Sequence, residues 1–305
     1  MKDVIAENLS MIDVERNIYE PASLHHQKRK KVKDYIDLLQ DPTNGVALKI
    51  KEDIIIGSKI YEMYQEIPVL VKENSTSREW KNLNSQFLNY HKSLSVYTLI
   101  NSAPINNYLS FETGFGFLED VKVLDVGGGT GHTMATFFRN PEKIDYYLLD
   151  PNLRLLHDQF IRLYPKLSYL EMGHIIGNAE TLPIKNNSFD VVLSISAIDH
   201  LDDYLKFINE AFRVLKKGGK FLVSSHLDII EAEEDQTKIK DKIFSSSFLE
   251  RLSRYLYYKK HKVGGDDHTL HLENEVPVEL ALKEVGFKII KKECFKRHFY
   301  FVAEK

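Results

Sequence analysis

The sequence predicts an α/β protein in which a largely parallel sheet has helices on both faces, preceded by a small α+β module. Three observations support this fold class. From about Val121 to the end of the 305 residues, apolar strand-like runs alternate with amphipathic stretches of helical spacing. The first of these runs leads into a cluster of glycines, which is typical of a ligand-binding turn after a parallel strand. The first 120 residues lack this alternation, so we expect them to form a separate unit.

The elements of the sheet domain follow in order along the chain. Val121–Val126 predicts a short buried strand, and the next apolar run ends in Asp150. HIIG, FDVVLSI and GKFLVSSH predict three further strands, and DDYLKFINEAFRVLKK predicts the helix before the last of these. Residues 216–218 have the composition of an ordinary helix stop. The sequence from Val276 predicts a helix, a glycine stop and two strands.

The N-terminal region divides into two parts. Residues 1–75 are expected to form the small module, and residues 76–118 a helical connector that covers the ligand, with a break at Pro104. The run KRKKVK at residues 28–33 is the densest basic segment of the chain. We interpret it as the solvated face of a helix, with nucleic-acid contact as the alternative.

The composition excludes several classes of protein. With 43 % hydrophobic and 28 % charged residues, the chain is neither a disordered nor a collagen-like protein. A net charge of −3 disfavours nucleic acid as a partner, and the single Cys294 cannot form an intrachain disulfide. We find neither a signal-peptide core nor an apolar run long enough to span a membrane. We therefore expect a cytoplasmic protein without membrane insertion, and the oligomeric state stays open.

The glycine cluster predicts the type of ligand. Gly127, Gly129 and Gly131 let the backbone turn sharply and approach a ligand closely. The dinucleotide fingerprint G-x-G-x-x-G needs a glycine where this chain has His132, so a pyrophosphate cradle is disfavoured. Asp150, at the end of the second strand, can accept hydrogen bonds from both hydroxyls of a ribose. Together these features predict a ligand that contains a nucleoside.

Four motifs extend this interpretation. VLDVGGGTGHT, LLDPN, GNAETLPIKNNSFDVVLSISAIDHLDD and RVLKKGGKFLVSSH resemble, in order and spacing, the class I S-adenosylmethionine-dependent methyltransferases. The resemblance covers residues 119–305 and is closest to the branch of quinone, sugar and other small-molecule methyltransferases. It implies a Rossmann-like seven-stranded methyltransferase sheet, with S-adenosyl-L-methionine as cofactor and S-adenosyl-L-homocysteine as product. Residues of about 227–274 are too many for a simple connection, and we expect them to form an inserted lid.

The resemblance assigns cofactor contacts to individual residues. It places Asp125 beneath the amino group of the methionine part, with the backbone of Gly127 and Gly129 along that part, and it places Asp150 at the ribose. The full expected cofactor-binding set is Asp125, Gly127, Gly129, Gly131, Asp150, Pro151, Asn178, Ala179, Ile195 and Ser196.

Three parts of this set lie around the adenine and the reactive sulfur. Asn178 and Ala179 stand where the family usually has Asp-Ala, whose carboxylate meets the adenine amino group. An asparagine amide can still accept that hydrogen bond and can donate another. Pro151 is expected to shape the adenine pocket, and Ile195 and Ser196 to border the sulfonium and the mouth of the acceptor site.

Two histidines are candidates for the catalytic base. A hydroxyl acceptor must lose its proton during methyl transfer, and an imidazole that titrates near neutral pH is suited to receive it. His200 follows the fourth strand, where the family often has Glu-His, although it could equally serve only to shape that loop. His226 ends the fifth strand at the same edge of the sheet. The segment GGDDHTLHLEN contains metal-ligand residue types, but its spacing matches no metal motif, so we predict no metal site.

The N-terminal module has a resemblance of its own. DYIDLLQDPTNGVALKIKEDIIIGSKIYEMYQEIPVLVKE resembles a small zinc-ribbon module that is fused to, or partners, some methyltransferases. The outline is kept at Leu39, Asp41, Pro42, Tyr61, Ile67, Pro68 and Leu70. Every metal-binding cysteine is absent, so we expect a degenerate module without zinc.

These features lead to three hypotheses about function. The first is methylation of a small-molecule acceptor, on oxygen of a sugar or related metabolite, with nitrogen and carbon as less favoured sites. The second is an RNA-modifying methyltransferase, which the net charge and the absence of an Asn-Pro-Pro-Tyr type motif disfavour. The third is a catalytically silent cofactor-binding subunit, which the complete glycine loop and Asp150 disfavour. The identity of the acceptor cannot be read from the sequence.

Overall fold

The structure, a computed structural model, describes residues 28–51, 54–71, 96–156, 164, 167–227, 272–295 and 297–305. These residues fold around a seven-stranded sheet with the strand order β11-β12-β10-β9-β6-β7-β8. The strands are β6 (Val121–Val126), β7 (Ile144–Leu149), β8 (Gly173–Ile175), β9 (Phe189–Ile195), β10 (Leu215–His226), β11 (Lys288–Phe295) and β12 (His298–Glu304). Strands β6 to β10 run parallel to one another, whereas β12 runs antiparallel to both β10 and β11. The predicted fold class is confirmed.

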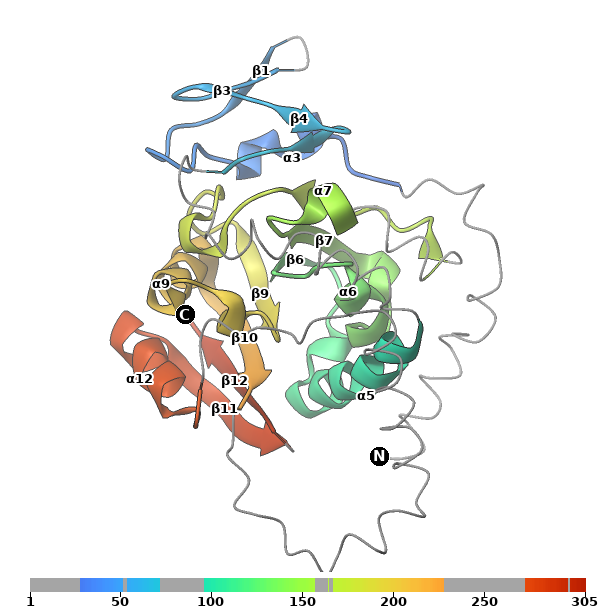
Figure 1. The fold of residues 1–305 in the computed structure, drawn as a ribbon, viewed down its shortest axis with the longest axis vertical. Coiled ribbons are helices and arrows are strands. Elements are labelled where there is room, and N and C mark those ends of the chain that lie inside the picture. The colour runs from blue at the N-terminus through green and yellow to red at the C-terminus, as the bar shows by residue number, and fades with distance from the viewer. Residues whose placement is uncertain are drawn as a thin grey trace, which may run out of the picture.

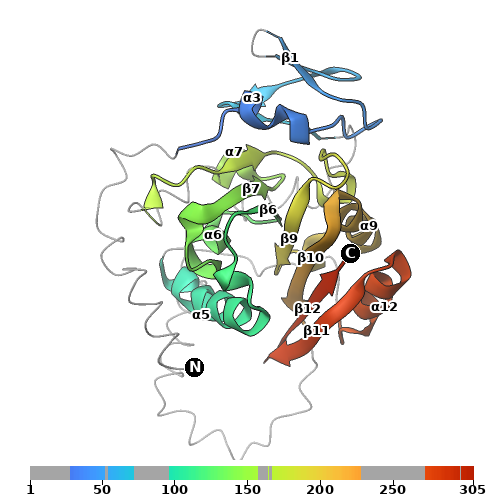
Figure 2. The same ribbon diagram turned by 180° about the vertical axis from the view of Figure 1, so that it is seen from behind.

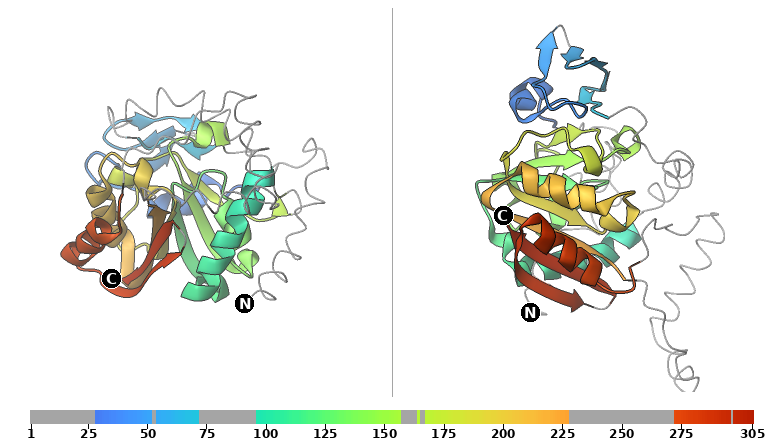
Figure 3. Two further views of the ribbon diagram at one scale, coloured as in Figure 1. Left: turned by 60° about the horizontal axis from the view of Figure 1, so that its bottom comes forward. Right: turned by 90° about the vertical axis from the view of Figure 1, so that its left-hand side faces the viewer.

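Helices cover both faces of the sheet (Figures 1 and 3). They are α5 (Val96–Thr113) and α6 (His132–Phe137) on one face, and α9 (Tyr204–Val214) and α12 (Val276–Val285) on the other. Neighbouring residues of β9 lie in different cores, Val192 with the α9 side and Leu193 with the α5 side. Parallel strands that are buried on both faces need apolar residues at every position, which explains the continuous run FDVVLSI.

The helix before β10 ends earlier than predicted. α9 ends at Val214, and residues 216–218 belong to β10 instead of forming a helix stop. Leu215 is fully buried and pairs with Phe189, and a longer helix would lose that burial. The register of β10 shifts between Leu215 and Lys220, and Gly218, with φ of 75°, lies in this irregular segment.

The predicted break at Pro104 is wrong, because α5 continues through it from residue 96 to 113. A proline in a helix removes one backbone donor, so other contacts must hold the helix. Two contacts after Pro104 do so. Asn106 Nδ2 donates to Thr136 Oγ1 of α6 at 3.1 Å, and Lys291 Nζ of β11 donates to the backbone oxygen of Glu112 at 2.7 Å.

A small module packs beyond the β8 edge of the sheet (Figures 1 and 2). It contains α3 (Val32–Tyr35), the 3-10 turn Ile36–Leu38, the antiparallel strands β1 (Lys49–Lys51), β2 (Ile54–Ile56) and β3 (Ile60–Tyr61), and the hairpin of β4 (Met63–Tyr64) and β5 (Ile67–Pro68). Leu39 and Ile55 share one buried core with Ile175 of β8. The Tyr35 hydroxyl donates to the backbone oxygen of His174 at 2.8 Å. The module and the sheet therefore have a continuous interior.

The basic run at residues 28–33 is not a solvated helix face. Arg29 pairs with Met172 as a parallel bridge along the sheet, and the helix begins only at Val32. Lys30 forms an ion pair with Asp145, and its ammonium lies 4.5 Å from the centroid of the Tyr147 ring. Part of the run is thus used to attach the module to the sheet.

Asp41 joins two loops of the module. Its buried carboxylate accepts a hydrogen bond from the Thr43 amide at 2.8 Å, and from both the amide and the hydroxyl of Ser58 at 2.6 Å. A Cβ atom at Gly57 would lie 2.4 Å from Asp41 Oδ2, so this glycine leaves room for the carboxylate. Burial alone would raise the pKa of Asp41, but the hydrogen bonds outweigh it and hold the pKa at about 2.

Several predictions lie outside the described residues. Residues 228–271 of the predicted lid, residues 76–95 of the connector and residues 1–27, 52–53 and 72–75 of the module are not described, so the domain boundaries stay predictions. The similarity of the module to a zinc ribbon is likewise still a prediction. None of the helices in the described ranges is both long and apolar enough to cross a membrane.

We predict that Asp41→Asn lowers the free energy of unfolding by about 1.5 to 3 kcal/mol at pH 7, the range for hydrogen bonds to a charged group. Because the pKa of Asp41 is depressed to about 2, its contribution is present above about pH 4 and is lost as the pH falls towards 2. The difference between wild type and variant should therefore shrink over that interval. Urea titrations across this pH range measure it, with the exposed Asp37→Asn as control. Equal stabilities at pH 7 would contradict the assigned role.

Candidate functional site

The glycine loop joins β6 to α6 at the carboxyl edge of the sheet. Gly127, Gly129 and Gly131 have φ angles of 74°, 56° and 77°, in the left-handed region that favours glycine. The Gly127 amide donates to the backbone oxygen of Leu149, at the end of β7, at 2.8 Å. A Cβ atom on Gly127 would lie only 2.5 Å from the Cβ of Ala197. Both the turn and the close approach therefore require glycine at position 127.

His132 begins α6 at the place of the missing third glycine. Its Nδ1 lies 3.4 Å from the hydroxyl oxygen of Thr130. Burial lowers the pKa of the imidazole to about 4, so the ring is neutral at pH 7. A neutral side chain larger than glycine replaces the close backbone approach of the dinucleotide motif. This fits the expectation that the loop does not bind a pyrophosphate.

Asp150 ties the end of β7 to the glycine loop. One carboxylate oxygen accepts a hydrogen bond from the Gly129 amide at 3.0 Å, and the other accepts one from the Asn152 amide at 2.7 Å. Burial raises the pKa of Asp150, and these two amides oppose the rise. Each oxygen keeps a second lone pair, so the carboxylate can still accept hydrogen bonds from a diol.

Asp125 is the second buried carboxyl group of the site. It lies on β6, next to β7, and accepts a hydrogen bond from the Tyr146 hydroxyl. Burial raises the pKa of Asp125 to about 7, against the opposing hydrogen bonds of Tyr146 and Thr133. A nearby cation would stabilise the ionised form of such a buried carboxyl group and would lower its pKa. The sequence predicted Asp125 but not Tyr146, because Tyr146 falls within an apolar run typical of a buried strand.

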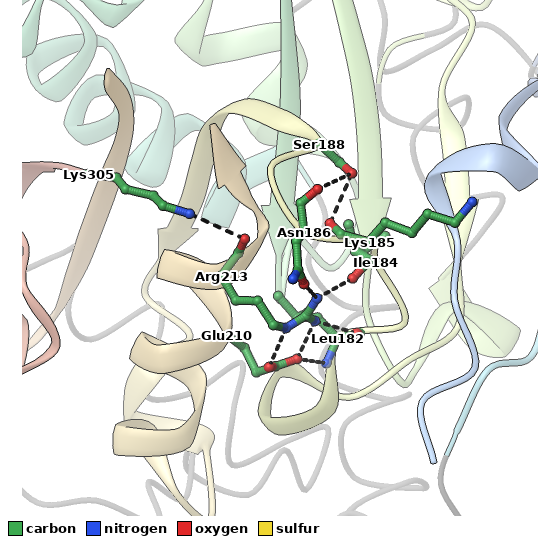
Figure 4. A network of polar contacts seen from close by, with 8 residues as sticks. All are labelled: Leu182, Ile184, Lys185, Asn186, Ser188, Glu210, Arg213 and Lys305. Atoms are coloured by element: carbon green, nitrogen blue, oxygen red, sulfur yellow. Dashed lines mark hydrogen bonds and ion pairs between the residues drawn. The ribbon is translucent and has the colours of Figure 1, made fainter. Parts of the chain in front are cut away.

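The loop between β8 and β9 begins at the buried residues Asn178 and Ala179 and is held by α9. Figure 4 shows the Arg213 guanidinium donating to the backbone oxygens of Leu182 and Ile184, at 3.0 and 2.6 Å. Glu210 pairs with Arg213 and accepts the Leu182 amide at 2.8 Å. This network fixes the segment that follows the predicted adenine contact.

The carboxyl end of β9 holds the residues predicted near the reactive sulfur. Ile195 is the last residue of the strand and is half-buried, and Ser196 is exposed. Ser196 has φ of 53°, and its amide donates to the backbone oxygen of Ser224 on β10 at 2.9 Å. Pro151 lies half-buried directly after Asp150. Ile195 therefore ends its strand, and Ser196 and Pro151 lie in the connections that follow β9 and β7, at the predicted edge of the sheet.

The two candidate histidines lie at different places along this edge. His200 ends the 3-10 turn Ile198–His200 in the connection that follows β9, and it is one of the groups that oppose the rise in the pKa of Asp150 caused by burial. His226 is the last residue of β10 and pairs across the strands with His298 of β12. The two rings meet edge to face, with centroids 5.2 Å apart. His298 was not predicted, because only the register of β10 and β12 brings it beside His226.

The described side chains contain no group of three or more metal-ligand residue types that could hold a metal ion. The predicted segment with Asp266, Asp267, His268 and His271 lies outside the described residues.

The residues present fit a nucleoside ligand with a cationic group. The Asp150 carboxylate has free lone pairs for a ribose, and the buried Asp125 suits a cation. The glycine loop that follows β6 lets backbone amides approach a ligand closely, because its glycines carry no side chains. Each of these groups is at the carboxyl end of β6 or β7, where parallel sheets bind ligands.

Comparison with known proteins identifies similar sequences in methyltransferases. Residues 124–223 match a protein family described as methyltransferase domain. The chain is 35 % identical over 99 residues to the chloroplastic 2-methyl-6-phytyl-1,4-hydroquinone methyltransferase 1 of Oryza sativa subsp. japonica, a match that covers 32 % of this chain and 29 % of the relative. It is 36 % identical over 106 residues to the ubiquinone/menaquinone biosynthesis C-methyltransferase of Rhizobium meliloti, which covers 34 % and 41 % of the two chains. The chain thus spans less than half the length of these curated relatives.

One solved structure extends the likeness beyond the matched sequence. An O-methyltransferase family protein from Burkholderia thailandensis superposes with a TM-score of 0.51 at 15 % identity, covering 74 % of this chain and 62 % of that chain. At this identity the likeness concerns the fold alone. Together, the comparisons show that residues 124–223 of this chain are similar to methyltransferase domains.

We predict that Gly127→Ala destabilises the protein by about 2 to 4 kcal/mol, because it adds a left-handed alanine and a clash with Ala197. Gly218→Ala is the matched control, since Gly218 has φ of 75° but no atom within 4 Å of the added Cβ. It should cost only about 1 to 2 kcal/mol. Thermal and urea denaturation of both variants measure the difference. Equal losses would show that the close approach at Gly127 contributes nothing.

Proposed function

We propose that this protein is an S-adenosylmethionine-dependent methyltransferase that acts on a small-molecule acceptor, with oxygen of a sugar or related metabolite as the methylated atom. The observation that supports it most is the placement of two buried acidic side chains, Asp125 and Asp150, at the carboxyl ends of neighbouring strands beside a left-handed glycine loop. The methyltransferase family match covers this loop and both carboxylates.

Each part of the site would hold one part of the cofactor. Asp125 would lie near the cationic amino group of the methionine part, with the backbone of Gly127 and Gly129 along it. Asp150 would accept hydrogen bonds from the ribose, and Asn178 would meet the adenine. When bound, the cofactor supplies a methyl group that is already activated, so the chain has mainly to align donor and acceptor and to exclude water.

A hydroxyl acceptor also needs a base. His200 lies towards Asp150, whereas His226 lies at the end of β10 beside His298. We propose that one of these two histidines receives the acceptor proton. The predicted insertion of residues 227–274 has enough residues to enclose a small acceptor. Its length is the reason that we propose a small-molecule acceptor.

Three alternatives have less support. Carbon methylation is suggested by the name of one curated relative, a C-methyltransferase, but that match covers only 34 % of this chain. RNA modification is disfavoured because Lys30 of the basic run is paired with Asp145. A silent subunit is disfavoured because the glycine loop and both carboxylates are intact.

A single cysteine suits a reducing compartment, and we propose that the protein is located in the cytoplasm.

We predict that S-adenosylhomocysteine binds the purified protein and that Asp150→Ala loses about 1.5 to 3 kcal/mol of this binding, the range for hydrogen bonds to a charged group. Asn178→Asp should bind equally well or better, because a carboxylate is a stronger acceptor for the adenine amino group. Calorimetry measures both, with Asp37→Ala as a control on the module. Absence of binding to wild type would overturn the proposed function. A large loss in Asn178→Asp would place the adenine elsewhere.

We predict that alanine at the true base, His200 or His226, lowers kcat by about 10² to 10⁴. Cofactor affinity should stay near that of wild type, and the pH profile should lose the limb that reports deprotonation of the histidine. The test requires a screen of candidate acceptors with labelled cofactor, followed by kinetics of both single variants. If both retain most of their activity, a histidine base is excluded.

A further inference from the structure

The N-terminal module makes contact with the two segments that flank the predicted adenosine site. On one side, the Ile176 amide donates to the backbone oxygen of Pro68 at 3.0 Å, and the Leu70 amide donates to that of Ile176 at 2.8 Å. Ile176 lies two residues before Asn178. The segment that leads from β8 to the predicted adenine contact at Asn178 therefore forms backbone hydrogen bonds with the module.

The same row of hydrogen bonds continues inwards to the glycine loop. The Asp150 amide donates to the backbone oxygen of Ile175 at 3.2 Å, and the Gly127 amide to that of Leu149 at 2.8 Å. The Asp150 carboxylate then accepts the Gly129 amide at 3.0 Å. An unbroken series of contacts thus runs from the module, through the ends of β8 and β7, to the loop after β6.

A second contact reaches the site by another route. Arg154 lies in α7 (Leu153–Leu156), the short helix directly after Asp150. Its guanidinium forms an ion pair with Glu62 of the module and lies 5.2 Å from the centroid of the Tyr64 ring. The backbone oxygen of Glu62 in turn accepts the amide of Val69 at 3.0 Å. Both contacts of the module therefore come from one short segment, residues 62–70.

We infer that residues 62–70 position the adenosine half of the cofactor site, so that docking of the module sets the affinity for the cofactor. The inference rests on the proposed function and adds a role for Glu62, Tyr64 and Arg154, which act through Asp150 and Asn178 and do not touch the cofactor. β8 is the edge strand of the sheet, and without the module its last residues would have no partner on the outer side. Since binding linkage is reciprocal, the cofactor must then also strengthen docking of the module.

The experiment measures both directions of this linkage. Because the ion pair and the ring contact are partly exposed, their combined loss is modest, and we expect the double variant Tyr64→Ala with Arg154→Ala to bind S-adenosylhomocysteine about 3- to 10-fold more weakly in calorimetry. The conservative pair Tyr64→Phe with Arg154→Lys keeps a ring and a cation and should restore most of the affinity. Ile60→Ala, at a side chain of the same module that is 69 % exposed, is the control and should bind like wild type.

Hydrogen exchange of the full chain supplies the second readout. S-adenosylhomocysteine should slow exchange in residues 62–70 as well as in residues 149–152 and 175–179, and the alanine double variant should lose the slowing in residues 62–70. If the contact were merely structural, its loss would lower the melting temperature, but S-adenosylhomocysteine would not slow hydrogen exchange in residues 62–70 of wild type. If wild type does not bind, the proposed function fails and this inference with it. If wild type and the double variant bind equally and residues 62–70 do not respond, the inference alone is overturned.

Discussion

The hydrogen bond between the Asp150 carboxylate and the Gly129 amide joins the ends of two parallel strands, and the arrangement of the site follows from it. The strand before the glycine loop and the strand that ends before Asp150 are neighbours in the sheet, so the carboxylate that follows one strand can reach the loop that follows the other. The glycines allow this because their left-handed angles bring backbone amides, and no side chains, towards the carboxylate. Asp125, buried on β6 next to β7, accepts the Tyr146 hydroxyl and is the second acidic group of the site.

The N-terminal module covers the edge of the same sheet at β8. An edge strand exposes unpaired backbone groups, and β8 is short. Residues 29 and 69 pair with Met172 and Ile176, one at each end of β8. The cores of module and sheet are continuous through Leu39, Ile55 and Ile175. The module is thus packed against the sheet with a shared interior.

The sequence was sufficient to predict features that depend on local pattern. Continuous apolar runs such as FDVVLSI predicted the parallel strands, and the spacing from Asp125 through the glycines to Asp150 predicted which residues meet at the carboxyl ends of β6 and β7. Features that depend on tertiary contact could not be predicted in this way. α9 ends at Val214 because Leu215 is buried against Phe189, α5 passes through Pro104 because α6 and β11 hold its second half, and His298 meets His226 only through strand register. Tyr146 belongs to the same group, because its partner Asp125 is on another strand.

The order of the last strands has a consequence for how the chain folds. β12 follows β11 in the sequence but lies between β11 and β10 in the sheet. On the ribosome, β11 therefore emerges before the strand through which it joins the rest, and it has no place in the sheet until β12 has been made. During that interval β10 is itself an open edge, a surface on which other unfinished chains can pair. The C-terminal hairpin then closes this edge in one step, and folding of this side of the protein is completed only after both of its strands are available.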